Sequence, residues 1–313
     1  MEIDPSPDFS AISPSHGAPA RSIASKIFLN ERGLRAGWRL LIYALLVAGL
    51  GFVCMSLVRH FVKPVHGVFS PGYFFLQESV SFAVIFGAAL IMARIEMRSP
   101  DVYGLPLKDA FGKLFWQGAL VGLIEITALI GLIATFGGYS FGAFALHGPD
   151  VLRWGLFWGG FFVVVGLFEE FLFRGYTQYT LADGIGFWPA AILLSIGFGL
   201  VHLGNPGEGW IGAAAVVMIG LIFAFALRRT GNLWFVVGLH ATFDFGETFL
   251  FSVPNSGIVL NGHLSNATLH GGRWLTGGTV GPEGSVFSFL TMFILAIVIH
   301  FMFPARNTTP LEN

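Results

Sequence analysis

Long apolar runs dominate this chain of 313 residues, and eight of them are long enough, or nearly long enough, to cross a bilayer. A spanning helix needs about 20 consecutive, mostly apolar residues. The predicted spans are residues 38–58, 73–95, 114–136, 158–179, 188–203, 210–228, 231–252 and 286–303. Because hydrocarbon offers no water to the backbone, runs this long and continuous must be helices rather than strands. The sequence therefore predicts an all-α, polytopic integral membrane helix bundle of about eight transmembrane helices.

The composition agrees with a membrane protein. Hydrophobic residues make up 54% of the chain and charged residues only 11%, whereas a soluble domain carries about 25% charged residues. The formal net charge is -1 and the basic residues form no long patch, so nucleic acid is excluded as a partner. The single cysteine, Cys54, lies in an apolar run and can form neither an internal disulfide nor a cysteine-based metal cluster. The lipid bilayer is the expected surroundings of the chain.

The domain organisation follows from the same runs. Residues 1–37 are rich in Ser, Pro and Ala and are predicted to be a flexible cytoplasmic tail. Residues 38–303 form the transmembrane domain, and residues 304–313 form a C-terminal tail. Of the 17 Lys and Arg residues, 13 fall on the inner side of this arrangement and four on the outer side, which predicts that both termini are cytoplasmic. We expect a protein of the plasma (inner) membrane.

Ionisable side chains lie inside three of the predicted spans. A charged side chain at the bilayer centre costs roughly 2.5–3.5 kcal/mol, so each one is a candidate functional residue. The clusters comprise Glu169, Glu170 and Arg174 in the fourth span, Phe198 and His202 in the fifth, and His240 and Asp244 in the seventh. The single acids Glu78 and Glu125, in the second and third spans, are interpreted as structural. The histidines of the long outer loop, 253–285, are interpreted as solvated.

Helical spacing assigns partners within two of the clusters. Glu170 and Arg174 stand four residues apart with the acid first, which is the favoured order for a helical ion pair. Glu169 lies about 100° around the helix from Glu170 and can face another direction. His240 and Asp244 stand one turn apart, so the carboxylate can orient the imidazole.

His202 has no acidic neighbour on its own helix, so its partner must come from another one. Glu169 is the obvious candidate. If the fourth span begins at Trp158, Glu169 lies about 16 Å below the outer face of a core about 30 Å thick. The three clusters can then meet between the middle and the outer half of the membrane. The alternative interpretation is that these residues are polar contacts that only hold helices together.

The three clusters resemble the motifs of a known family. They match Glu-Glu-x-x-x-Arg at Glu169, then Phe-x-x-x-His at Phe198, then His-x-x-x-Asn or Asp at His240, in that order. These are the motifs of the CPBP family, the CAAX proteases and bacteriocin-processing enzymes also called Abi proteins, and the type II CAAX prenyl endopeptidases are among them. The similar region, residues 158–252, would be the catalytic core.

The resemblance implies an intramembrane endopeptidase in which Glu169 and His202 activate a water molecule. Glu170, as part of the first motif, would belong to the catalytic group as well as to the ion pair with Arg174. His240 and the residue at 244 would stabilise the oxyanion. An ionised Asp244 cannot donate a hydrogen bond as Asn could, so Asp244 is either protonated, or orients His240, or helps to bind a metal.

Two questions stay open at the level of the sequence. Family members are named as metalloproteases, and Glu169, His202, His240 and Asp244 could supply three zinc ligands and an open water position; a metal-free glutamate mechanism is the alternative. The expected partner is a peptide or protein substrate at the membrane, which need not be prenylated. The competing functions are a non-catalytic membrane scaffold or immunity protein, and a transporter, which the absence of inverted halves disfavours.

Overall fold

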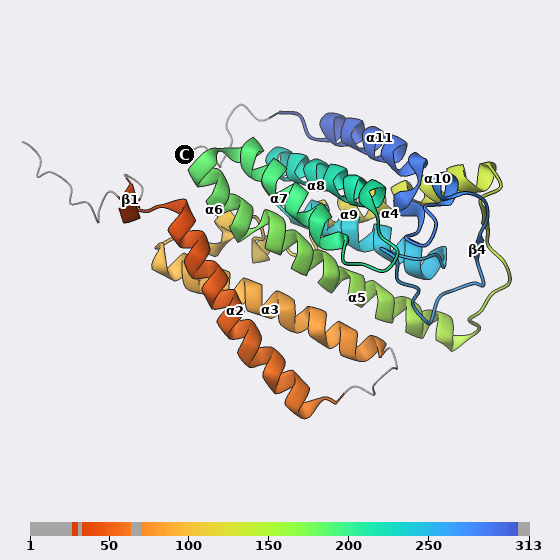
Figure 1. The fold of residues 1–313 in the computed structure, drawn as a ribbon, viewed down its shortest axis with the longest axis horizontal. Helices are drawn as coiled ribbons and strands as arrows, with labels where there is room; N and C mark the ends of the chain where they lie inside the picture. Colours follow the sequence, from red (N-terminus) through yellow and green to blue (C-terminus); the bar gives the residue numbers. More distant parts are fainter. Residues whose placement is uncertain (1–26, 31–32, 64–69, 306–313) are drawn as a thin grey trace, which may run out of the picture.

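The computed structural model describes residues 27–30, 33–63 and 70–305 of the chain, and it is a bundle of α-helices (Figure 1). The helices are α2 (Ala36–Phe61), α3 (Pro71–Ile95), α4 (Lys113–Thr135), α5 (Pro149–Arg174), α6 (Tyr176–Ile185), α7 (Phe187–His202), α8 (Trp210–Thr230), α9 (Trp234–Phe245), α10 (Arg273–Thr276) and α11 (Val286–Met302). Short helical turns are η1 (Pro100–Tyr103), η2 (Leu107–Asp109), η3 (Gly246–Leu250) and η4 (Pro282–Gly284). The predicted all-α class is confirmed.

Two small antiparallel strand pairs accompany the helices. Strand β1 (Leu29–Asn30) pairs antiparallel with β2 (Gly33–Leu34) just before α2. Strand β3 (Tyr139–Ser140) pairs antiparallel with β4 (Thr268–Leu269), and this pair joins the connection after α4 to the long loop after η3. Most of the predicted N-terminal tail, including residues 1–26, lies outside the described residues, as does the chain from residue 306 onwards.

Each of the eight predicted spans coincides with helical structure, and the chain is an integral membrane protein. Five helical stretches are both long and apolar enough to cross a bilayer, namely α2, α3, α4, the continuous stretch of α5 with α6, and α8. The other three are shorter. Helices α7 and α11 have 16 and 17 residues, and α9 has 12 residues continued by the five-residue π-helical turn η3.

The predicted boundaries of the fourth span were wrong. Helix α5 begins at Pro149 rather than at residue 158, because Gly148 has φ 54°, outside the helical region, and proline suits a first helical turn. The first turns of α5 are held by the loop after η3, where Trp158 donates its indole N–H to the carbonyl of Gly262 at 3.2 Å. The helix ends at Arg174 and α6 starts again at Tyr176. The depth estimate that started at Trp158 therefore does not hold.

Helix α9 lies at the centre of the bundle and packs mainly against α4 and α5. Glycines bring its backbone close to that of α4. A Cβ added at Gly118 would lie 1.9 Å from the carbonyl oxygen of Phe235, and one added at Gly238 would lie 2.1 Å from that of Phe115. Small residues at such crossings permit close helix contact in membranes. Larger side chains at these glycines would displace α9, the helix that carries His240.

The connections between helices alternate between the two ends of the bundle. In Figure 1 the loops around β3 and β4, between α7 and α8, and between η3 and α11 gather at one end. The start of α2, the turn from α5 to α6 and the end of α11 lie at the other. This alternation matches the predicted order of spans and puts the loop 253–285 over the end where the polar residues of α5, α7 and α9 converge.

Candidate active site

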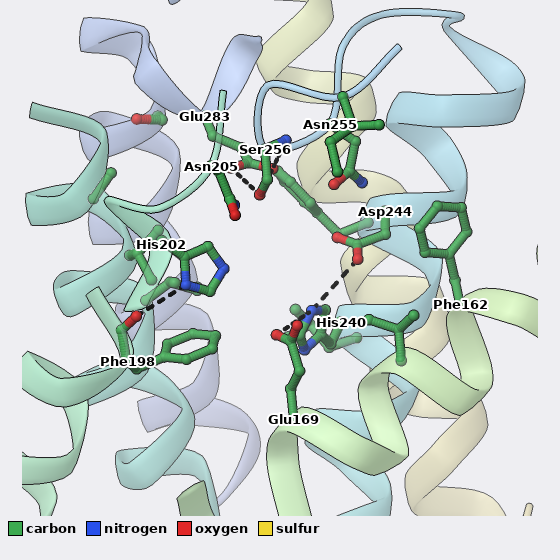
Figure 2. Close-up of a pocket in the computed structure, with 18 of the residues that line it drawn as sticks. Phe162, Glu169, Phe198, His202, Asn205, His240, Asp244, Asn255, Ser256 and Glu283 are labelled. Carbon is green, nitrogen blue, oxygen red and sulfur yellow. Dashed lines mark hydrogen bonds and ion pairs between the residues drawn. The ribbon is translucent and has the colours of Figure 1, made fainter. Parts of the chain in front are cut away.

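A cavity of about 290 Å³ lies among α3, α4, α5, α7, α8, α9, α11 and the loop 253–285 (Figure 2). Aromatic and aliphatic side chains make up most of its wall. Its polar lining includes five carboxyl groups and two imidazoles, which belong to Glu78, Glu125, Glu169, Asp244, Glu283, His202 and His240. Ligand sites in proteins are usually concave, mostly apolar and furnished with a few convergent polar groups. The cavity has this character, and it contains four of the predicted site residues.

His240 is held on both of its ring nitrogens. Its Nδ1 lies 2.9 Å from Oε1 of Glu170, and its Nε2 lies 3.4 Å from Oδ2 of Asp244 and 3.8 Å from Oε2 of Glu169. The predicted contact between His240 and Asp244 is present. Glu170, which the sequence paired only with Arg174, makes the shorter contact. Because a carboxylate accepts hydrogen bonds, the Glu170 contact places a proton on Nδ1.

The predicted ion pair between Glu170 and Arg174 is present and completely enclosed. Nη1 of Arg174 lies 3.3 Å from each carboxylate oxygen of Glu170, and the side chains of the two residues are 1% and 0% exposed. The guanidinium also stands over the ring of Phe198, 4.4 Å from its centroid. Arg174 therefore neutralises Glu170, and Glu170 in turn orients His240, a chain that links α5 to α9.

Glu169 and His202 face the cavity from opposite sides (Figure 2). The side chain of Glu169 is 25% exposed, while that of the adjacent Glu170 is fully buried. Nδ1 of His202 lies 2.9 Å from the carbonyl oxygen of Phe198 in the preceding turn. A carbonyl only accepts, so Nδ1 carries the proton and Nε2 is left for the cavity.

The expected direct contact between His202 and Glu169 is absent. Among the described residues no hydrogen bond or ion pair joins the two side chains. The reason is geometric: α7 packs mainly against α8 and α6, and far less against α5, so the two helices approach across the cavity rather than through touching side chains. The space between the side chains of His202 and Glu169 is where a further molecule would bridge them.

The loop 253–285 contributes residues that sequence reasoning missed. Asn255, Ser256 and Glu283 line the cavity, and Glu283 accepts hydrogen bonds from the hydroxyl and backbone N–H of Ser256. Burial raises the pKa of the Glu283 carboxyl. The two acids interpreted as structural, Glu78 and Glu125, also line the cavity. The prolines Pro254 and Pro282 are typical of turns, but they give no sign of burial.

The residues named for zinc are divided between the two sides of the cavity (Figure 2). Within the described part of the chain, no group of three or more His, Cys, Asp or Glu side chains is arranged to hold a metal ion. Nδ1 of His240 and Nδ1 of His202 are both directed to protein acceptors, which leaves Nε2 of each for the cavity, and the two imidazoles stand on opposite sides of the cavity (Figure 2). The zinc site stays a prediction, and we derive no catalytic step through a metal.

A family model described as type II CAAX prenyl endopeptidase Rce1-like matches residues 151–246. The resemblance to the CAAX proteases is confirmed. The matched segment runs from the first turns of α5 to the end of α9, so it includes Glu169, His202, His240 and Asp244. This part of the membrane helix bundle is thus similar to the CAAX-type endopeptidases. Comparison with curated proteins found no match. The loop that carries Asn255 and Glu283 lies beyond the matched segment.

Proposed function

We propose that this core hydrolyses a peptide bond of a membrane-associated or lipidated peptide or protein, with water activated by Glu169 and His202. One observation carries the proposal. Two groups able to accept a proton, the Glu169 carboxylate and Nε2 of His202, face each other across one cavity that is otherwise mostly apolar. A general base must come within hydrogen-bond reach of its water, directly or through one further water molecule.

The proposed reaction uses these groups in sequence. A water molecule between Glu169 and His202 loses a proton to the Glu169 carboxylate while its oxygen attacks the scissile carbonyl carbon. The carbonyl oxygen becomes an oxyanion next to His240, whose orientation is fixed by Glu170. Collapse of the tetrahedral intermediate breaks the C–N bond, and the proton held by Glu169 passes to the leaving amine. The products are a carboxylic acid and an amine, with no net gain or loss of protons at the site.

The direct test is cleavage of a membrane-anchored peptide by the purified protein and by its Glu169→Gln variant. Cleaved peptides are found by comparing membrane proteomes of cells that contain the parent protein with those of cells that contain the variant. A scaffold or immunity protein would depend on the packing of these residues and not on the proton-accepting oxygen. Substrates that accumulate only with the variant would support the endopeptidase.

Asp244→Asn distinguishes a metal-free reaction from a zinc reaction. We expect the variant to keep at least about a tenth of the parent rate, in contrast to the roughly 10²–10³-fold loss that follows removal of an oxyanion donor. The reason is that Glu170 still holds His240 and the new amide adds a donor. The measurement is peptide cleavage with and without chelator, together with metal analysis of the purified protein. Loss of activity together with loss of bound zinc would support the metal reaction instead.

The proposed orientation places both termini in the cytoplasm and the loop 253–285 outside, in the plasma membrane. It rests on the excess of Lys and Arg at one end of the bundle. Reporter fusions after residue 313 and within residues 253–285 are expected to report opposite sides of the membrane. Fusions that report the same side would contradict the arrangement of eight spans.

A further inference from the structure

The proposed reaction lacks one hydrogen-bond donor. An oxyanion is usually stabilised by two or more pre-positioned donors, and His240, when protonated on both ring nitrogens, supplies one through Nε2. The third motif places Asp244 where Asn is the other permitted residue, and an ionised carboxylate has only acceptor oxygens. Asp244 instead lies with Oδ2 3.4 Å from Nε2 of His240. A donor from outside the three motifs would complete the site.

Asn255 has an amide group that is buried and unused. Its Nδ2 is inaccessible to solvent and finds no acceptor among the residues that the structure describes. The residue lines the cavity, and in Figure 2 its side chain lies above Asp244, on the same side of the cavity as His240. A buried N–H group without an acceptor is costly and rare in proteins. Because the residue lines the cavity, rotation about its Cβ–Cγ bond would turn this N–H toward an acceptor that enters from outside the protein.

The turn that carries Asn255 is fixed from several directions. The backbone N–H of Asn255 donates to the carbonyl of Ile258 at 3.0 Å, and the N–H of Ile258 donates back to the carbonyl of Asn255 at 2.8 Å. The neighbouring Ser256 has φ 45°, a left-handed conformation unusual for a residue other than glycine, and Glu283 holds both its N–H and its hydroxyl. Strained, tightly bonded turns are frequent at functional sites.

The packing of the next residue leaves the turn little freedom. Gly257 has φ 81°, and a Cβ added there would lie 1.9 Å from the carbonyl oxygen of Pro206 in the connection between α7 and α8. Its N–H donates to the carbonyl of Val280 at 2.8 Å. Donors that are pre-positioned need no reorganisation when charge develops in the transition state. The turn therefore has the rigidity that such a donor requires.

We propose that the side-chain amide of Asn255 donates a hydrogen bond to the oxyanion, together with Nε2 of His240, and so replaces the donor that Asp244 cannot provide. This inference rests on the proposed endopeptidase function. It gives the loop 253–285 a part in the chemistry. It also explains why the third motif can end in Asp in this chain.

The test compares Asn255→Leu and Asn255→Asp with the parent protein. Both substitutions preserve the approximate shape of the side chain and remove the N–H donor, and only the second adds a charge. We expect kcat to fall about 10²–10³-fold in both, with KM nearly unchanged, because the donor acts on the transition state. Asn261→Asp, an exposed site in the same loop, is the matched control and should cleave like the parent.

A second substitution separates chemistry from loop structure. Adding Asp244→Asn to Asn255→Leu moves an amide donor to the neighbouring wall of the cavity, and we expect it to restore at least about tenfold of the lost kcat. The role of Asn255 would be overturned, and the endopeptidase left intact, if the Asn255 variants cleave within about threefold of the parent. The same conclusion would follow if the loss is seen only in KM, or if Asp244→Asn gives no rescue. A parent protein that cleaves no faster than Glu169→Gln would instead overturn the proposed function, and the role of Asn255 with it.

Discussion

Glu169→Gln protein is expected to fold like the parent and to lose peptide cleavage by about 10²–10⁴-fold, the usual contribution of a general base. The amide keeps the shape of the side chain, but it cannot accept the proton of an attacking water molecule. The side chain is partly exposed to the cavity and takes no part in the enclosed pair of Glu170 with Arg174. The substitution therefore removes chemistry and leaves packing in place.

The measurement is the single-turnover rate of peptide cleavage in detergent or liposomes, alongside the thermal unfolding temperature. Asp150→Asn is the matched control, because it makes the same carboxylate-to-amide change at an exposed position in the first turn of the same helix. The control should cleave at the parent rate. If Glu169→Gln cleaves as fast as the control, Glu169 is not the base, and a scaffold that uses the polar residues for packing becomes the better interpretation.

Arg174→Ala is expected to lower the free energy of unfolding by about 3–5 kcal/mol, the usual cost of leaving one partner of a buried ion pair alone. Glu170 would remain fully enclosed without its guanidinium partner. The substitution would also empty the space over the ring of Phe198, which the guanidinium now occupies. Most of the protein should therefore fail to accumulate in the folded state.

The consequence of losing Arg174 extends to the cavity, because Glu170 also holds Nδ1 of His240. We expect the folded fraction of Arg174→Ala to cleave more slowly per molecule than the parent. The measurements are the unfolding temperature in detergent and the yield of folded protein, with the activity corrected for that yield. Arg153→Ala, an exposed position on the same helix, is the control. An unfolding temperature equal to that of this control would show that the pair contributes little.

The features that depend on local geometry could be predicted from the sequence. Apolar runs longer than about 17 residues are typical of membrane spans, so seven of the eight spans could be predicted from length alone. Residues four apart on a helix are neighbours whatever surrounds them. This explains why the pair of Glu170 with Arg174 and the contact of His240 with Asp244 were predicted and are present.

Which helix faces which depends on the packing of the whole bundle. The distance from His240 to Glu170 and the gap between His202 and Glu169 depend on how α5, α7 and α9 pack, and spacing along one helix carries no information about that. The loop 253–285 has the composition of a solvated loop, yet the β3–β4 pair and the hydrogen bonds of Glu283 fold it over the cavity. The burial that leaves the Asn255 amide without an acceptor is created by segments distant in the chain, because burial is a property of the packed bundle and not of the residue.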